Sequence, residues 1–143
     1  MSTLPPGYAL TDDPARIDPV AAHAYLTRSY WSPGIPLDII RRAIANSICV
    51  AVLHGDTQVA MARVISDRAT FAYLADVYVL EEHRGQGLSK AMLGHLHARS
   101  ELQGLRRWAL FTRDAHELYA QFGWQKTQHP ERLMLCENPD VYA

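Results

Sequence analysis

One stretch of the chain, residues 70–112, constrains the fold more than any other. Residues 70–80 are apolar or aromatic on both faces, with Asp76 as the conspicuous exception, and this pattern predicts a strand in the middle of a sheet. A polar loop at 81–86 and helical spacing over 87–102 follow, and residues 107–112 form another apolar run. Strand, glycine-containing loop, helix and strand in this order make a crossover unit. The two strands are therefore predicted to be parallel, with the helix on one face of the sheet.

The segments on either side of this unit predict further strands and helices. Those before it are a strand at 8–10, helices at 19–28 and 37–46, and a hairpin of strands at 47–53 and 58–66. After it, Asp114 begins a helix with capping-box spacing that ends at Gly123, and a short hairpin follows near 124–126 and 132–136. We therefore predict one domain, residues 1–143, with a mixed α/β sheet of six or seven strands and helices on both faces.

Composition and charge limit the classes of function. The chain has 14 Lys and Arg against 15 Asp and Glu, a net charge of -1, which gives no broad cationic field for a nucleic-acid backbone. The longest apolar runs, such as 48–53, fall far short of the roughly 18 residues that a membrane-spanning helix needs. The first residues lack the features of a secretory signal. We expect no nucleic-acid partner, no membrane span and a cytoplasmic location, with Cys49 and Cys136 reduced and buried.

The junction between the strand at 70–80 and the following helix is suited to an anion. Gly85 and Gly87 allow a tight turn that brings backbone N–H groups against a ligand, and the start of a helix adds a partial positive charge. Arg84 and Lys90 could pair with phosphate oxygens. The spacing satisfies neither the Walker loop nor the dinucleotide fingerprint. A glycine turn that merely connects strand and helix is the alternative.

Three segments carry a family resemblance: residues 76–79, 84–89 and 118–124. In sequence and in order they resemble the GNAT superfamily of acetyl-CoA-dependent N-acetyltransferases. Arg84-Gly85-Gln86-Gly87-Leu88-Ser89 matches the signature [Q/R]-x-x-G-x-[G/A] until its last position, where Ser89 replaces Gly or Ala. Asp76-Val77-Tyr78-Val79 is similar to the acidic-Leu-Tyr-Val strand of the family, and residues 118–124 are similar to its Leu-Tyr-x-x-x-Gly-Phe helix end. The common family Asn seven residues before the tyrosine is Thr112 here.

The resemblance implies acetyl-CoA as the cosubstrate and assigns residues to it. The pantetheine arm would pair with the backbone of Val77, Tyr78 and Val79. The diphosphate would lie on the loop and first helical turn, which consist of Arg84, Gly85, Gln86, Gly87, Leu88, Ser89 and Lys90. The hydroxyl of Ser89 is expected to donate to a phosphate oxygen. Family members often pair, so a homodimer is a further implication.

The resemblance also implies the catalytic roles. Tyr119 aligns with the tyrosine that donates a proton to the sulfur of coenzyme A, and a phenol with a pKa of about 10 is protonated at neutral pH. Packing on an amphipathic helix is the alternative role for Tyr119. Asp76 is either the base for the incoming ammonium, directly or through water, or a structural carboxylate that accepts hydrogen bonds from a turn or pairs with an Arg. Direct transfer without an acyl-enzyme is expected.

The acceptor is expected to be an amine, but the sequence does not identify it. Small amines, amino acids, peptides and amino-sugar drugs all stay open. Tyr30 and Trp31 lie in a Pro- and Gly-containing loop between the first two helices, and they are expected either to bind this amine or to pack at the rim. The seven histidines have no zinc-site spacing, so no metal is expected. Two other functions compete: a noncatalytic acyl-CoA sensor and a nucleotide-binding regulatory domain.

Overall fold

The structure, a computed structural model, describes residues 4–143 and contains one five-stranded sheet. Its strands lie in chain order: β1 (Tyr8–Thr11), β2 (Ile48–His54), β3 (Thr57–Ser66), β4 (Phe71–Val79) and β5 (Arg107–Ala109). Neighbours from β1 to β4 pair antiparallel, whereas β4 and β5 pair parallel. The predicted α/β class and the predicted parallel crossover unit are thereby confirmed.

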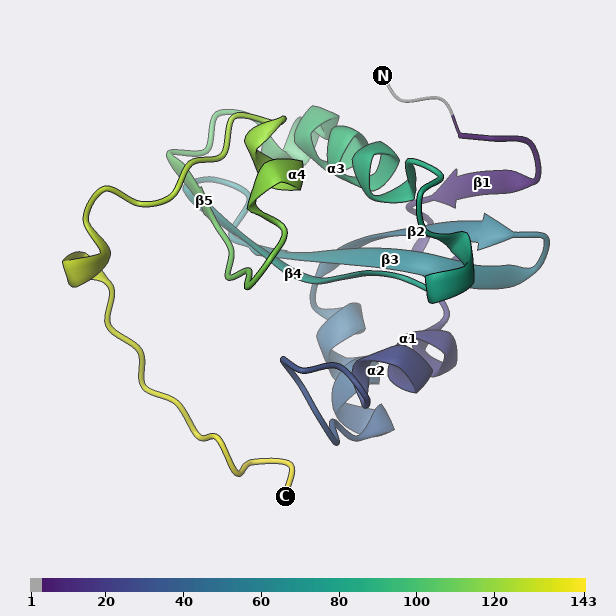
Figure 1. The fold of residues 1–143 in the computed structure, drawn as a ribbon, viewed down its shortest axis with the longest axis horizontal. Helices are drawn as coiled ribbons and strands as arrows, with labels where there is room; N and C mark the ends of the chain where they lie inside the picture. The colour runs from purple at the N-terminus through teal and green to yellow at the C-terminus, as the bar shows by residue number, and fades with distance from the viewer. Residues whose placement is uncertain (1–3) are drawn as a thin grey trace.

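Helices cover both faces of the sheet (Figure 1). α3 (Leu88–Ala98) and α4 (His116–Ala120) lie on one face, and α1 (Pro19–Leu26) and α2 (Leu37–Ala45) lie on the other. Alternation along the strands explains the two layers, because successive side chains point to opposite faces. In β3, Ala62 and Val64 belong to the apolar cluster under α3, whereas Met61 belongs to the cluster under α1 and α2.

The first helix begins where the sequence predicts. The side chain of Asp18 accepts hydrogen bonds from the N–H groups of Val20 and Ala21, and Pro19 occupies the first helical position. The buried side chain of Gln58 then fixes this helix to the sheet, since it accepts from Asp18 N and donates to Asp18 O. The loop at 27–36 that follows α1 reaches β4, where Trp31 Nε1 donates to Asp76.

The C-terminal region differs from the prediction in three ways. The sheet has five strands rather than six or seven, because the hairpin predicted near 124–126 and 132–136 does not form within the described residues. β5 ends at Ala109, not at residue 112, and α4 begins at His116. Asp114 does not cap α4; the hydroxyl of Thr112 accepts the N–H of Ala115 instead. The apolar pattern at 133–135 predicted a strand, but a strand needs a neighbour to satisfy its backbone.

The two cysteines have different surroundings. Both are free; Cys49 is buried, whereas Cys136 is exposed on the C-terminal segment, so the prediction of two buried thiols is wrong for Cys136. Burial raises the pKa of the Cys49 thiol to about 11, which keeps it protonated and unreactive. In the described part of the chain, no helix has both the length and the apolar character to cross a membrane.

Candidate active site

A cleft opens where β4 and β5 separate. The two strands pair only from Phe71 to Tyr73, opposite Arg107 to Ala109, and β4 then continues to Val79 without this neighbour. The cleft has a volume of about 1460 Å³, and it is lined by residues 74–79 on one side and by residues 110–114 on the other. Pockets for small ligands commonly measure roughly 300–1,000 Å³. The opening is therefore large enough for an extended ligand with an acceptor beside it.

A bulge in β4 lies at the centre of this cleft. Met61 is opposite Tyr78 and Arg63 is opposite Ala75, so Asp76 and Val77 together face the single residue Ala62. Asp76 has a φ of 52, in the left-handed region, which Asp adopts more readily than most residues. A bulge of this kind leaves backbone groups without ladder partners and redirects side chains. The bulge lies on the β3 side of β4, and on its β5 side β4 has no strand neighbour beyond Tyr73, so residues 76–79 line the cleft there.

The glycine loop ends at the open N-terminus of α3. Gly85 and Gly87 have φ values of 78 and 80, a conformation that glycine adopts without strain. Gly87 is the N-cap of α3, and no side chain caps the helix. The first N–H groups of a helix have no partners within it. Leu88, Ser89 and Lys90 line the cleft, so the cleft includes a helix N-terminus, a feature whose N–H groups are chemically suited to an anion.

The two cations beside the loop have different environments. Arg84 donates from Nε to the carbonyl of Val79 at 3.0 Å and from Nη2 to the hydroxyl of Tyr25 at 3.0 Å. It thereby ties the loop to the end of β4 and to α1. Lys90 makes no ion pair with any carboxylate in residues 4–143. Within residues 4–143 Arg84 makes no ion pair either, so both charges are available to an anionic ligand, but the guanidinium of Arg84 is held in place by its two hydrogen bonds.

Tyr119 projects from α4 into the same cleft. Its side chain is 8% exposed, and burial raises its pKa to about 12, with smaller contributions from Tyr30 and Asp114. The phenol is therefore protonated throughout the neutral range and can donate a proton to a strong base.

Asp76 has a donor on each carboxylate oxygen. Trp31 Nε1 donates to Oδ1 at 3.0 Å, and Arg63 Nε donates to Oδ2 at 2.9 Å. Arg63 also donates from Nη1 to the hydroxyl of Ser47. The side chains of Arg63 and Asp76 are only 15% and 11% exposed. This network joins the bulge of β4 to the loop that follows α1, and it supports the structural alternative for Asp76.

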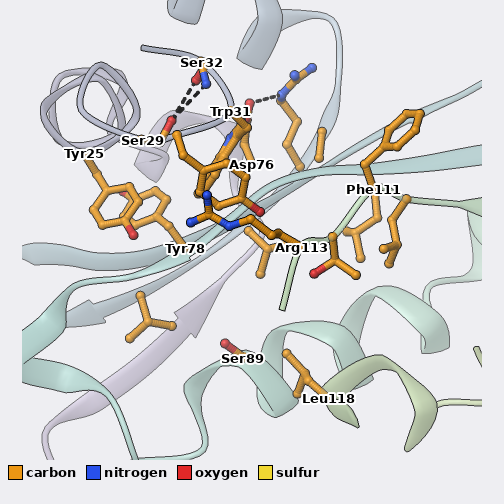
Figure 2. Close-up of a pocket in the computed structure, with 18 of the residues that line it drawn as sticks. Tyr25, Ser29, Trp31, Ser32, Asp76, Tyr78, Ser89, Phe111, Arg113 and Leu118 are labelled. Carbon is orange, nitrogen blue, oxygen red and sulfur yellow. Dashed lines mark hydrogen bonds and ion pairs between the residues drawn. The ribbon is translucent and has the colours of Figure 1, made fainter. Parts of the chain in front are cut away.

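The loop at 27–36 brings two aromatic rings to the cleft. The rings of Tyr30 and Trp31 meet edge to face with centroids 5.0 Å apart. The guanidinium of Arg113, which comes from the segment before α4, lies 3.8 Å from the centre of the Tyr30 ring. Figure 2 shows Trp31 and Asp76 on one side of β4, with Ser89 of α3 and Leu118 of α4 on the other. The cleft thus has an aromatic side and a helix-terminus side.

Most of the site residues predicted from the sequence line one cleft. Those that do are Tyr30, Trp31, Asp76, Val77, Tyr78, Val79, Arg84, Gly85, Gly87, Leu88, Ser89, Lys90 and Tyr119. Gln86 does not line it and is exposed to solvent. The side chain of Tyr78 packs against α1: it stacks on Tyr25 with ring centroids 4.6 Å apart and accepts a hydrogen bond from Gln58. Only the backbone of Tyr78 is therefore available to a ligand beside β4.

Sequence reasoning missed four residues that shape the cleft: Tyr25, Gln58, Arg63 and Arg113. The sequence could have revealed Gln58 and Arg63, because each is a polar residue within an apolar strand and buried polar side chains need partners. No pattern in the sequence marks Tyr25 or Arg113. Among residues 4–143, no three His, Cys, Asp or Glu side chains are grouped so that they could hold a metal ion.

Comparison with known proteins agrees with this geometry. The acetyltransferase (GNAT) domain family matches residues 45–126, which is more than half of the chain. A crystal structure of a provisionally assigned GNAT acetyltransferase from Xanthomonas campestris pv. campestris is 45% identical, with a TM-score of 0.91 over 96% of this chain and 98% of its own. A provisionally named acetyltransferase of Gibberella zeae is 34% identical over 137 residues, which cover 80% of this chain and 76% of that protein.

A more distant structure has a similar fold and was solved with a ligand. A predicted acetyltransferase from Clostridium acetobutylicum, solved with acetyl-CoA, is 18% identical with a TM-score of 0.63 over 90% of this chain and 94% of its own. At that identity the likeness concerns the fold alone. The family match and the two closer relatives are sufficient: this chain belongs to the GNAT acetyltransferase family.

Proposed function

We propose that this protein transfers the acetyl group of acetyl-CoA directly to an amine of a small molecule or peptide. One observation carries the proposal: the unpaired end of β4, the uncapped N-terminus of α3 and the phenol of Tyr119 all face one cleft. Acetyl transfer needs a site for a diphosphate, a path for the pantetheine arm and a proton donor for the thiolate. Each of these three needs has a matching feature in the cleft.

The cofactor half of the site uses mainly backbone groups. The pantetheine arm pairs with the free edge of β4 at Val77, Tyr78 and Val79, as an added strand would. The diphosphate lies on the amides from Arg84 to Lys90, with Lys90 and the hydroxyl of Ser89 as further donors. Arg84 contributes by holding the loop, since its guanidinium is bonded to Val79 and Tyr25.

The reaction is a direct displacement at the thioester. The amine nitrogen forms a bond to the carbonyl carbon, and a tetrahedral intermediate results. The carbon–sulfur bond then breaks, and Tyr119 gives its proton to the departing thiolate. One proton of the incoming ammonium leaves to water before the attack, and a second, lost from the nitrogen of the tetrahedral intermediate, returns through water to the Tyr119 phenolate and regenerates the phenol. Asp76 holds Trp31 and Arg63 rather than taking either proton, because both of its oxygens already accept hydrogen bonds. Trp31 and Tyr30 form the acceptor side.

Two measurements test the proposal. Calorimetry with coenzyme A should show binding, and acetyl-CoA with a broad amine panel should release thiol. Binding without turnover on any amine would favour the acyl-CoA sensor, and no binding of the coenzyme would contradict both functions. ATP that displaced coenzyme A at similar concentration would favour the nucleotide-binding domain. The cytoplasmic location stays a prediction.

A further inference from the structure

Arg113 brings a positive charge to the acceptor side of the cleft. It comes from the segment between β5 and α4 and extends into the cleft (Figure 2). Of the other cations that line the cleft, Arg84 and Lys90 lie at the glycine loop, whereas Arg28 and Arg63 each pair with a carboxylate, at 2.7 and 2.9 Å. Arg113 makes no ion pair in the described part of the chain. Its charge is therefore available to a ligand on the acceptor side.

An aromatic ring supports the guanidinium of Arg113. The central carbon of this group lies over the ring of Tyr30, 3.8 Å from the ring centre. Tyr30 meets Trp31 edge to face, and Trp31 donates a hydrogen bond to Asp76 of β4. The ring under Arg113 is thus itself connected to the sheet. A guanidinium that is already held on a ring is preorganised, so it loses less side-chain freedom when it binds a ligand.

The chemistry of a single held guanidinium favours a carboxylate. Arginine presents its N–H donors in a planar fork, which matches the two oxygens of a carboxylate with two parallel hydrogen bonds. A simple amine approaches as an ammonium, and the positive charge of Arg113 repels it. A phosphate carries nearly twice the charge of a carboxylate, which one arginine does not balance. An acceptor that carries a carboxylate besides its amine gains a charged hydrogen bond here.

Two carboxylates in the same cleft suit the amine end of such an acceptor. Asp114, next to Arg113, and Glu137, on the segment after α4, line the cleft, and neither makes an ion pair within residues 4–143. Beyond burial, which contributes most, Tyr30 and Asp114 each raise the pKa of Tyr119, so both lie near its phenol. A negative charge near Tyr119 attracts an ammonium, while the positive charge over Tyr30 attracts a carboxylate. The acceptor side thus carries charges of both signs.

We propose that the acceptor is an amine that also carries a carboxylate, with free amino acids as the simplest members of this class, and that Arg113 binds the carboxylate. The inference rests on the proposed acetyl transfer and narrows its acceptor. Amines without an anionic group bind less well, because nothing in them balances Arg113. Amino-sugar drugs, which carry several positive charges, are opposed by the same residue.

Paired acceptors test the inference. A panel of amino acids is offered to the protein with acetyl-CoA, each as the free acid and as its neutral amide, and thiol release is measured. The free acid should have the higher kcat/KM by about 10–100-fold, as expected for a charged hydrogen bond. Basicity alone works in the opposite direction, since the nearby carboxylate raises the pKa of the amine in the free acid.

Variants of Arg113 assign this preference to the guanidinium. Arg113→Gln should bring the kcat/KM of the free acid down to that of the amide, mainly through a higher KM. Arg113→Lys keeps the charge without the planar fork, so it should retain part of the preference. Arg41→Gln is the matched control, because Arg41 is an exposed arginine of α2 that does not line the cleft. It should leave the preference unchanged.

The outcomes separate this inference from the proposed function. Amides or simple amines that turn over as well as the free acids would overturn the inference and leave acetyl transfer intact. A preference for the free acid that persists in both Arg113→Gln and Arg113→Lys would also overturn it, as would equal losses for the acid and the amide. Coenzyme A binding without turnover of any amine would contradict the proposed function itself, and the inference with it.

Discussion

The two sides of the cleft are built in different ways. The cofactor side consists of one continuous piece of chain, from Asp76 in β4 through the glycine loop to Lys90 in α3, and it presents mainly backbone groups. The acceptor side is assembled from side chains of distant segments: Trp31 is hydrogen-bonded to Asp76, and Tyr30 lies under Arg113. A binding site made of backbone groups is kept when many of its side chains are substituted. A binding site made of side chains is weakened when any one of them is substituted. Substitutions on the two sides should therefore affect different steps.

The largest effect is expected at Tyr119, where the two sides meet. Tyr119→Phe should lower kcat by roughly 10²–10⁴-fold with little change in coenzyme A affinity, because only the proton donor is lost. Since burial raises the pKa of Tyr119 to about 12, the natural protein should show no alkaline loss of rate from this group below about pH 11.

The matched control for this substitution is Tyr73→Phe, because Tyr73 lines the same cleft from β4. It should change kcat less than about threefold. A loss of similarly small size in Tyr119→Phe, measured by thiol release, would remove Tyr119 from the mechanism.

The glycine loop gives the next largest effect. An added Cβ at Gly87 meets nothing within 4 Å, but the φ of 80 is strained for alanine by about 1–2 kcal/mol. Gly87→Ala should therefore weaken coenzyme A binding by about 5–30-fold in calorimetry, with kcat at saturation nearly unchanged.

Gly94→Ala is the control for the loop, since Gly94 lies within α3 and its added Cβ would make an ordinary contact with Phe122. It should leave coenzyme A affinity unchanged and stabilise the helix by about 0.5–1 kcal/mol. Equal losses of affinity in both variants would contradict a backbone diphosphate site.

Asp76→Asn tests, on the acceptor side, whether Asp76 is a structural carboxylate or the general base. Asn accepts the left-handed φ of this position and keeps an oxygen for Trp31, but the amide nitrogen that replaces Oδ2 carries no charge and cannot accept from Arg63 Nε. We expect the KM for the amine to rise about 3–10-fold, the value of one modest hydrogen bond, because the bond to Trp31 on the acceptor side is retained. The acidic limb of the pH–rate profile should not move. Disappearance of that limb together with a loss in kcat of about 100-fold or more would instead make Asp76 the base.

The smallest effect concerns Ser89, where the chain departs from the family signature. Ser89→Ala restores the small residue and removes one donor at the start of α3. Coenzyme A affinity should fall about threefold, the value of one modest hydrogen bond. Tighter binding by the variant would show that the hydroxyl obstructs the ligand. The control is Ser100→Ala, in the turn after α3.

Local patterns were sufficient for the cofactor side. The end of the apolar strand from its single acidic residue onward, the two glycines and the helix start lie within fifteen consecutive residues, from Asp76 to Lys90. Their conformations depend on neighbours in the chain, since positive φ at glycine and an open helix N-terminus are local properties. The predicted parallel pairing of β4 and β5 followed from the length of the connection between them.

Distant contacts decided the rest. The sequence could offer two roles for Asp76, but only the fold brings Arg63 and Trp31 to its two oxygens. The predicted C-terminal hairpin did not form, because the apolar run 133–135 specifies a strand without specifying a partner for it. The sequence alone therefore determined the glycine loop and the helix start that we propose for the coenzyme, because their geometry is set within a few residues. The tertiary structure decided the acceptor side and the C-terminal segment, because the energy of buried charges and apolar faces depends on what packs against them.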